Sequence, residues 1–370
     1  MSPASLSAMA TKVERGGKLS RDKSVASLRI RERSEELEGT TLAPYATKSA
    51  DGRRDRPDEP SPTRMAFAVD RDRIIHSKAF RRTKHKTQVF LAPVGDHYRT
   101  RLTHILEVNQ IGRAIARALR LNEDLVEAMA LGHDIGHTPF GHTGEELLAR
   151  FLPEGFRHNQ QSVRIAEKLE NNGAGLRLTM QTLDGMLKHS SPTEGGLETA
   201  AWGEPETPEG WVVRYADKIA YLHHDIDDAM RAGIITEADL PPDLRAALGS
   251  DRAERLDTMI YDVIVTSYGK PDVTMSAAVL EATNALRKFM FDNVYLSGPA
   301  KTEDEKAQGV LWELLRYFEA HPERMPAEHQ RIAAQENTKR AVADYIAGMT
   351  DTYALDTFTS LFIPAAWSHL

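Results

Sequence analysis

The feature that most constrains the fold is a helix-like spacing of apolar residues that recurs from about residue 70 to the end of the chain. In the segment 100–120, for example, Ile111, Ile115 and Leu119 follow one another at intervals of four, which places them on one face of a helix. Alternating runs of strand length are scarce, with Val89–Leu91 and Val263–Val265 as the only faint candidates. The sequence therefore predicts an all-α fold. The expected helices span residues 70–83, 100–120, 122–133, 143–152, 158–171, 178–188, 209–232, 241–247, 251–267, 275–292, 303–320, 328–348 and 350–361.

Bulk properties exclude several classes of protein. The chain has no cysteine, so disulfides and thiolate metal ligands are ruled out. A net charge of −7 argues against attraction of nucleic acid to the protein as a whole. No apolar run approaches the roughly 20 residues that a membrane span requires, and residues 1–26 lack the apolar segment of a signal peptide. We therefore expect a cytoplasmic protein without membrane contact.

Composition along the chain predicts three parts. Residues 1–62 are polar and mixed in charge, which predicts a flexible segment with short anchored pieces at Ser34–Leu37 and Leu42–Tyr45. Residues 63–235 contain the chemically distinctive motifs and are expected to form the core. Residues 236–370 are expected to form a helical C-terminal part that packs on the core and takes part in oligomer contacts.

The most distinctive segment lies between Ala130 and Glu146. From His133 onward it holds three histidines, one aspartate and two glutamates, interleaved with glycines and a proline. His133 and Asp134 are adjacent, so on a regular helix their side chains would point about 100° apart. The glycines at 132 and 136 predict that the helix ends there, which would let both side chains turn toward one point. A His-Asp pair alone is not a metal site.

Two further ligand candidates lie on neighbouring helices. His104 lies at the edge of the apolar stripe in residues 100–120, and Asp217 begins a polar face with Tyr221 and Asp225 at intervals of four. Taken singly, His104 could be a half-buried core histidine and Asp217 a surface acid. Together with His133 and Asp134 they form a mixed nitrogen and oxygen donor set. Such a set suits Mn, Mg, Fe, Co or Zn, and we favour Mn or Mg.

The order H…HD…D resembles the HD phosphohydrolase superfamily, and the surrounding residues are similar to the deoxynucleoside triphosphate triphosphohydrolase, or dGTPase-like, family. The similarity extends from Arg73 to Asp228 and weakens after about residue 300. It implies an HD-domain helical phosphohydrolase core with additional C-terminal helices. It also implies a divalent metal on His104, His133, Asp134 and Asp217, and hydrolysis of a dNTP to a deoxynucleoside and triphosphate. The matching blocks are Ser77–Arg82, Lys86–Phe90, Arg99–His104, His133–Glu145, Tyr215–Tyr221 and His224–Asp228.

The resemblance also implies roles for residues around the metal. His142 and Glu145, spaced i, i+3 at a helix start, match a catalytic pair in which the carboxylate orients the imidazole; plain helix capping is the alternative. His137 ranks below them as a residue that protonates the leaving oxygen or contacts phosphate. The implied substrate contacts are Arg101 and Lys218 to phosphates, Gln88 to the base or sugar, and Tyr221 and Asp225 to the sugar.

Basic residues concentrate between Ile74 and Phe90, among them Lys78, Arg82 and Lys86. They could form a solvated helix face or a wall that binds a polyphosphate, and the resemblance favours phosphate.

Two other classes of function remain. One is another HD phosphohydrolase, such as a 5′-nucleotidase or a cyclic-nucleotide phosphodiesterase. The other is a non-catalytic module that binds nucleotides or, weakly, single-stranded nucleic acid. The resemblance further implies a homo-oligomer, either a tetramer or a hexamer, and leaves open a dNTP activator at a subunit interface.

Overall fold

A computed structural model describes residues 29–88, 99–190, 203–295 and 300–364. Within these ranges the chain forms helices α3 to α18 and no strand, only a single bridge between Thr87 and Thr100. The all-α prediction is therefore confirmed. Val263–Val265 lies inside a helix, so that strand candidate was wrong, while Val89–Leu91 and residues 1–28 of the flexible segment lie outside the described ranges.

The helices follow the predicted order, with two splits and one addition: α3, a helix of 12 residues, lies in the segment 1–62 that was expected to be flexible. The predicted helix 70–83 is two helices, because the Ser77 hydroxyl caps a new helix by accepting from Phe80 N–H at 3.0 Å. The predicted helix 328–348 is also two, because Asn337 caps the second by accepting from Arg340 N–H at 2.8 Å. The bounds are α3 Ile30–Thr41, α4 Ala66–Ile75, α5 Lys78–Arg82, α6 Arg101–Leu119, α7 Glu123–Gly132, α8 Gly141–Phe151, α9 His158–Arg164, α10 Met180–Lys188, α11 Pro208–Arg231, α12 Pro242–Leu248, α13 Arg252–Ser267, α14 Ala277–Met290, α15 Ala300–Ala320, α16 Ala327–Gln335, α17 Thr338–Ala347 and α18 Asp351–Phe362.

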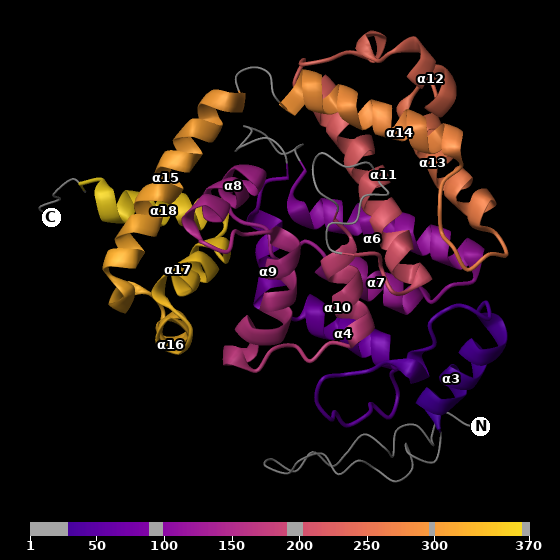
Figure 1. Ribbon diagram of the computed structural model, residues 1–370, viewed down its shortest axis with the longest axis horizontal. Coiled ribbons are helices and arrows are strands. Elements are labelled where there is room, and N and C mark those ends of the chain that lie inside the picture. Colours follow the sequence, from indigo (N-terminus) through magenta and orange to yellow (C-terminus); the bar gives the residue numbers. More distant parts are fainter. Residues whose placement is uncertain (1–28, 89–98, 191–202, 296–299, 365–370) are drawn as a thin grey trace, which may run out of the picture.

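Helices α6, α7 and α11 form the centre of the molecule (Figure 1). Their apolar faces meet in the main hydrophobic core, where Ile111, Val126 and Ile219 are almost fully buried. Gly112 allows α6 and α7 to approach closely, since a Cβ there would lie 2.9 Å from Cγ1 of Val126. The same core continues into α13 and α14 through residues such as Met259. It thus crosses the predicted boundary at 235/236, and the division into core and C-terminal part stays a prediction.

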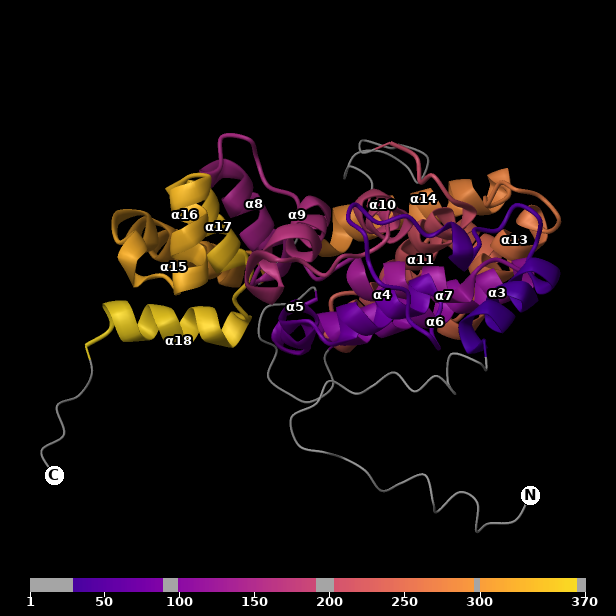
Figure 2. The same cartoon turned by 90° about the horizontal axis from the view of Figure 1, so that it is seen from below.

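The last four helices form a C-terminal lobe, α15–α18, that packs on α8 around a second hydrophobic core. Figure 1 shows this lobe beside α8, and Figure 2 shows α18 along its edge. Asp351, at the start of α18, accepts from Phe140 N–H at 3.0 Å and from Thr87 N–H at 2.9 Å. The lobe therefore fixes the loop between α7 and α8. None of the described helices has the length and apolar character needed to cross a membrane.

Candidate metal centre and active site

The loop after α7 carries His133 and Asp134 where the helix ends, as the flanking glycines predicted. His133 Nδ1 contacts the carbonyl of Ala130 at 2.6 Å, and this leaves its Nε2 buried and without a hydrogen-bond partner among the described residues. Ser162 on α9 clamps the loop, because its hydroxyl donates to His133 O at 2.6 Å and accepts from Gly136 N–H at 2.9 Å. A Cβ at Gly136 would lie only 2.2 Å from Ser162 N, so this close approach requires glycine.

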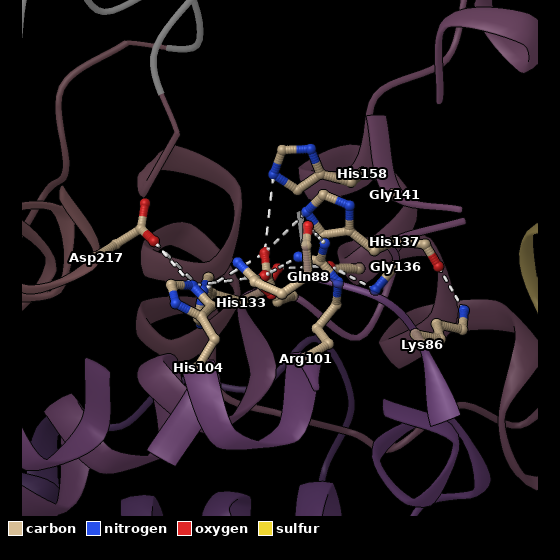
Figure 3. Close-up of polar contacts among 12 residues, drawn as sticks. Lys86, Gln88, Arg101, His104, His133, Gly136, His137, Gly141, His158 and Asp217 are labelled. Carbon is tan, nitrogen blue, oxygen red and sulfur yellow. Dashed lines mark hydrogen bonds and ion pairs between the residues drawn. The ribbon is translucent and has the colours of Figure 1, made fainter. Parts of the chain in front are cut away.

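The structure brings the four predicted metal ligands together from α6, α11 and the loop after α7 (Figure 3). His104 Nε2 lies 3.2 Å from Asp217 Oδ1 and 3.7 Å from Asp134 Oδ2. His133 Nε2 lies 3.4 Å from Asp134 Oδ1 and 3.8 Å from Asp217 Oδ1. Ligand atoms bonded to one ion at about 2.1 Å are separated by about 3 Å in cis positions. These side chains are therefore spaced for one common ion.

The chemical state of these donors also fits a divalent cation. Burial would raise the pKa of the Asp217 carboxyl, but His104, Lys218 and His133 hold it far below its usual range. Burial lowers the pKa of His104. Ionised carboxylates and neutral imidazoles are the states that bind metal. The buried Nε2 of His133, which has no hydrogen-bond partner in the part of the chain that the structure describes, is the atom that an ion would satisfy.

Glu145 on α8 holds two imidazoles. The Nδ1 atoms of His142 and His158 lie 3.2 Å and 3.1 Å from Glu145 Oε2. The other oxygen, Oε1, accepts from the backbone N–H of His158 at 3.0 Å. Burial would raise the pKa of Glu145, but His158 and His142 hold it well below its usual range. His142 is largely exposed whereas Glu145 is buried. The predicted pair is thus formed, and it is extended inward by His158.

Two histidines of the site had no predicted role. The ring of His158 stacks on His137 with centroids 4.0 Å apart, and Figure 3 shows both rings above the metal ligands. His189, directly after α10, places its Nε2 3.3 Å from His158 Nε2. A signal for His158 exists in the sequence, because His158 and Asn159 lie in a further block that resembles the family, although no role is implied for them. His189 gave no signal, since a single histidine at a helix end is common.

The predicted substrate residues lie around the same centre. Arg101 is buried and its Nη1 donates to Asp134 Oδ2 at 2.6 Å, while its Nη2 donates to Gln88 O at 3.3 Å. Burial lowers the pKa of Lys218, which lies next to Asp217. Tyr221 is half-buried. Asp225 is fully buried, and its Oδ1 lies 3.2 Å from His224 Nε2.

The basic segment before α6 is used differently from the prediction. Lys86 is buried, and its ammonium donates to His137 O and, at 2.8 Å, to Ala347 O. Lys86 therefore ties the loop to α17, and its assignment to a polyphosphate-binding wall was wrong. Lys78 and Arg82 line a pocket of about 420 Å³ between α5, α9, α16 and α17 that includes none of the four metal ligands.

The carboxylates around His224 predict a pH-dependent stability. Burial would lower the pKa of His224, but Asp225 and Glu107 raise it to about 9 from 6.5. A raised pKa in the folded state stabilises the fold fully below pH 6.5, and this contribution is lost as the pH rises to about 9. We expect the stability advantage of the wild type over His224→Gln to shrink across that window by up to about 1.4 kcal/mol per pH unit. Urea unfolding of both proteins from pH 6 to 9.5 at fixed metal concentration measures this difference in the free energy of unfolding. A difference that stays constant over this pH range would contradict the prediction.

A helical fold that gathers the residues of an H…HD…D motif at one buried point defines the class of HD-domain phosphohydrolases. The family model for the HD domain matches residues 101–222, and the model for a phosphohydrolase-associated domain matches residues 273–360.

Relatives narrow the class. A deoxyguanosinetriphosphate triphosphohydrolase-like protein of Caldanaerobacter subterraneus subsp. tengcongensis is 55% identical, over 92% of this chain and 98% of that protein. A protein of the same description from Clostridium perfringens is 48% identical, over 91% and 98% of the two chains. The chain therefore belongs to the deoxyguanosinetriphosphate triphosphohydrolase-like family of HD phosphohydrolases. The likeness continues past residue 300, where the resemblance was expected to weaken. Among solved structures, a hypothetical protein from Aquifex aeolicus matches with a TM-score of 0.45 and 20% identity, over 78% of this chain and 67% of that one.

Proposed function

We propose that the protein hydrolyses deoxynucleoside triphosphates to deoxynucleoside and inorganic triphosphate. Water adds at the α-phosphorus, the bond from that phosphorus to the 5′-oxygen breaks, and the 5′-oxygen takes a proton. The observation that carries the proposal is the meeting of His104, His133, Asp134 and Asp217 at one buried point beside the Glu145–His142 pair. The names of the relatives support the choice of substrate.

A divalent ion, Mn or Mg before Fe, Co or Zn, is proposed to bind His104, His133, Asp134 and Asp217. When bound, it supplies positive charge that offsets the charge of the α-phosphate. Arg101 would place a second positive charge next to the ion. Its buried guanidinium donates to Asp134, one of the proposed metal ligands. A cation in so dry a site acts strongly on a nearby phosphate oxygen.

His142 and Glu145 are proposed as the acid-base pair. The ionised Glu145 carboxylate accepts from His142 Nδ1, which leaves Nε2 of that ring to take or give a proton. His142 is exposed by 70% and can reach a bound substrate. His137 stays a lower-ranked candidate for a phosphate contact or for protonating the leaving oxygen. Burial and Arg101 lower the pKa of His137 well below its usual range, which disfavours protonation of the leaving oxygen by this ring.

Recognition of the nucleotide is proposed to involve five residues that surround the metal ligands. Arg101 and Lys218 are assigned to phosphates, Gln88 to the base or sugar, and Tyr221 with Asp225 to the sugar. The buried Oε1 of Gln88 lacks a partner among the described residues, which fits an acceptor awaiting a ligand donor.

Product analysis tests the proposal. Purified protein would be incubated with Mn²⁺ or Mg²⁺ and each of the four dNTPs or GTP, and the products would be separated by ion exchange. We expect deoxynucleoside and intact triphosphate. Monophosphate, diphosphate or free phosphate would instead identify another HD phosphohydrolase. Absence of turnover, with single and with mixed dNTPs, would favour the binding-only alternative.

Replacing Tyr221 tests the selection for deoxyribose. The half-buried ring is proposed to occupy the space that a 2′-hydroxyl would need, so Tyr221→Ala should relax discrimination against GTP. We expect the ratio of kcat/KM for dGTP to that for GTP to fall by about tenfold or more, which corresponds to about 1.4 kcal/mol of lost discrimination. Tyr353→Ala, at an exposed position on α18, serves as the control. An unchanged ratio would remove Tyr221 from sugar selection.

The protein is also proposed to be a cytoplasmic homo-oligomer, a tetramer or a hexamer. Support comes from α13 and the residue that follows it, because Tyr261, Val265 and Tyr268 are exposed by 69%, 54% and 67%, and such a stripe often marks an interface. A dNTP activator at a subunit interface and weak binding of single-stranded nucleic acid stay predictions. Light scattering with and without mixed dNTPs would give the subunit number and show whether nucleotide changes it.

A further inference from the structure

The imidazole of His224 on α11 lies between the proposed metal ligands and the two residues assigned to the sugar. It is fully buried and packs edge-on against the ring of His104, with centroids 4.9 Å apart. It also makes an edge-on contact with the ring of Tyr221, at 6.4 Å between centroids. Its Nε2 forms an ion pair with Asp225 Oδ1 at 3.2 Å. One ring therefore contacts the metal centre and both residues of the proposed sugar site.

The other side of the His224 ring is held by a carboxylate from α6. Glu107 Oε2 accepts from His224 Nδ1 at 3.0 Å, while Glu107 Oε1 accepts from Arg99 Nε at 3.0 Å. Arg99 is itself fixed, because its Nη1 donates to Asp228 Oδ1 at 2.8 Å. The side chains of Arg99 and Glu107 are 13% and 30% exposed. Arg99 and Glu107 therefore hold the buried imidazole from the side that is nearer the surface.

The charges of these groups restrict the orientation of Asp225. His224 Nδ1 donates to one carboxylate and Nε2 faces a second, so the ring between them carries both protons as an imidazolium. Its positive charge offsets the cost of burying the Asp225 carboxylate, and the ion pair holds Oδ1 in one position. Loss of Glu107 would release the ring and, with it, the constraint on the Asp225 side chain.

The sugar of a deoxynucleoside triphosphate offers this carboxylate a single donor. The 5′-oxygen carries the triphosphate and the 2′ position has no hydroxyl, so the 3′-hydroxyl is the only hydroxyl group of the sugar. An ionised carboxylate only accepts hydrogen bonds. If Asp225 contacts the sugar, it therefore accepts from the 3′-hydroxyl, and the strength of that bond depends on how well the carboxylate is oriented.

We propose that Glu107, held by Arg99, is a positioning residue for recognition of the sugar. Acting through His224, it orients the Asp225 carboxylate toward the 3′-hydroxyl and fixes the ring against which Tyr221 packs. Glu107 itself makes no contact with the substrate. The inference rests on the proposed function, because it requires a deoxynucleotide whose sugar lies at Tyr221 and Asp225.

A substrate that lacks the 3′-hydroxyl separates positioning from a general structural role. The steady-state kcat/KM of the full-length protein would be measured for dGTP and for 2′,3′-dideoxy-GTP, which offers Asp225 no donor. We expect the wild type to prefer dGTP by about tenfold or more, since a hydrogen bond to a charged group contributes this much. Glu107→Gln should lose most of this preference, because kcat/KM falls for dGTP and stays nearly constant for the dideoxy substrate.

Two further variants complete the test. Glu127→Gln removes the charge of another glutamate that pairs with an arginine, Arg71 on α4, and should keep the full preference for dGTP. Arg99→Gln leaves the contact between Glu107 and His224 in place but releases the other oxygen of Glu107. It should therefore reduce the preference in the same direction, and it decides the question if Glu107→Gln fails to fold.

The outcomes distinguish this inference from the proposed function. An equal loss of kcat/KM for both substrates in Glu107→Gln, or a wild type that does not prefer dGTP, would overturn the positioning role and leave the reaction untouched. If the wild type hydrolyses neither nucleotide, the proposed function fails. The ratio of the dissociation constants for the two nucleotides, measured in the wild type and in Glu107→Gln, then decides the positioning role in the same way.

Discussion

Under the proposed function, Asp134→Ala should abolish turnover of every dNTP and remove the proposed metal ion. The Asp134 carboxylate lies between two imidazoles: its Oδ2 is near His104 Nε2 and its Oδ1 is near His133 Nε2. Loss of an ion that contributes several kcal/mol of transition-state stabilisation corresponds to a rate loss of about 10³-fold or more. Metal analysis and steady-state kinetics on the purified variant measure both effects. Retained turnover would remove the metal from the proposed function.

The same substitution also removes the carboxylate that pairs with Arg101. The effect of this lost ion pair on stability must be distinguished from the effect of losing the metal. A buried charge stripped of its counter-ion costs about 3–5 kcal/mol, so Asp134→Ala should also unfold at lower urea concentration. Asp134→Asn keeps an oxygen that accepts from Arg101 but not the counter-charge, so it should recover part of this stability while still losing the ion. Asp124→Ala, at the partly exposed start of α7, is the control and should keep both metal and activity.

The sequence predicted the fold well because helical periodicity is a local property. Apolar spacing predicted α6 and α11 to within a residue or two at each end, and capping by Ser77 and Asn337 explains both splits. The adjacency of His133 and Asp134 between two glycines was also readable, since glycine at a helix end changes local geometry. Each of these inferences depends on residues within a few positions of one another.

Other features depend on packing that no local pattern encodes. Lys86 resembled its exposed basic neighbours, yet its ammonium is held by carbonyls from the loop after α7 and from α17. His189 reaches the site only because α10 packs on α9 and α7. Asp351 fixes Phe140 across 211 positions of sequence. A single sequence carries the identities of these residues but not the contacts that give them a role.

Glu145→Gln should lower kcat by about 10²–10³-fold while the ion on His104, His133, Asp134 and Asp217 stays bound. General acid–base catalysis typically accelerates a reaction by factors of this order. The amide of glutamine lacks the negative charge that orients and stabilises a protonated imidazole. Burial would lower the pKa of His158, but the Glu145 carboxylate raises it, so removal of that negative charge should lower the pKa of the His158 ring. The acid limb of the pH–rate profile should therefore move to lower pH.

The adjacent residue supplies a matched control for that experiment. Glu146→Gln makes the same chemical change one position away on α8, but this side chain is exposed by 64% and pairs only with Arg150 among the described contacts. It should leave kcat, KM and the pH profile unchanged. If Glu145 served only to cap or stabilise α8, Glu145→Gln would lower the urea midpoint without moving the pH profile. A shifted profile with metal retained therefore separates a role in proton transfer from a structural one, and an unchanged rate would exclude Glu145 from the mechanism.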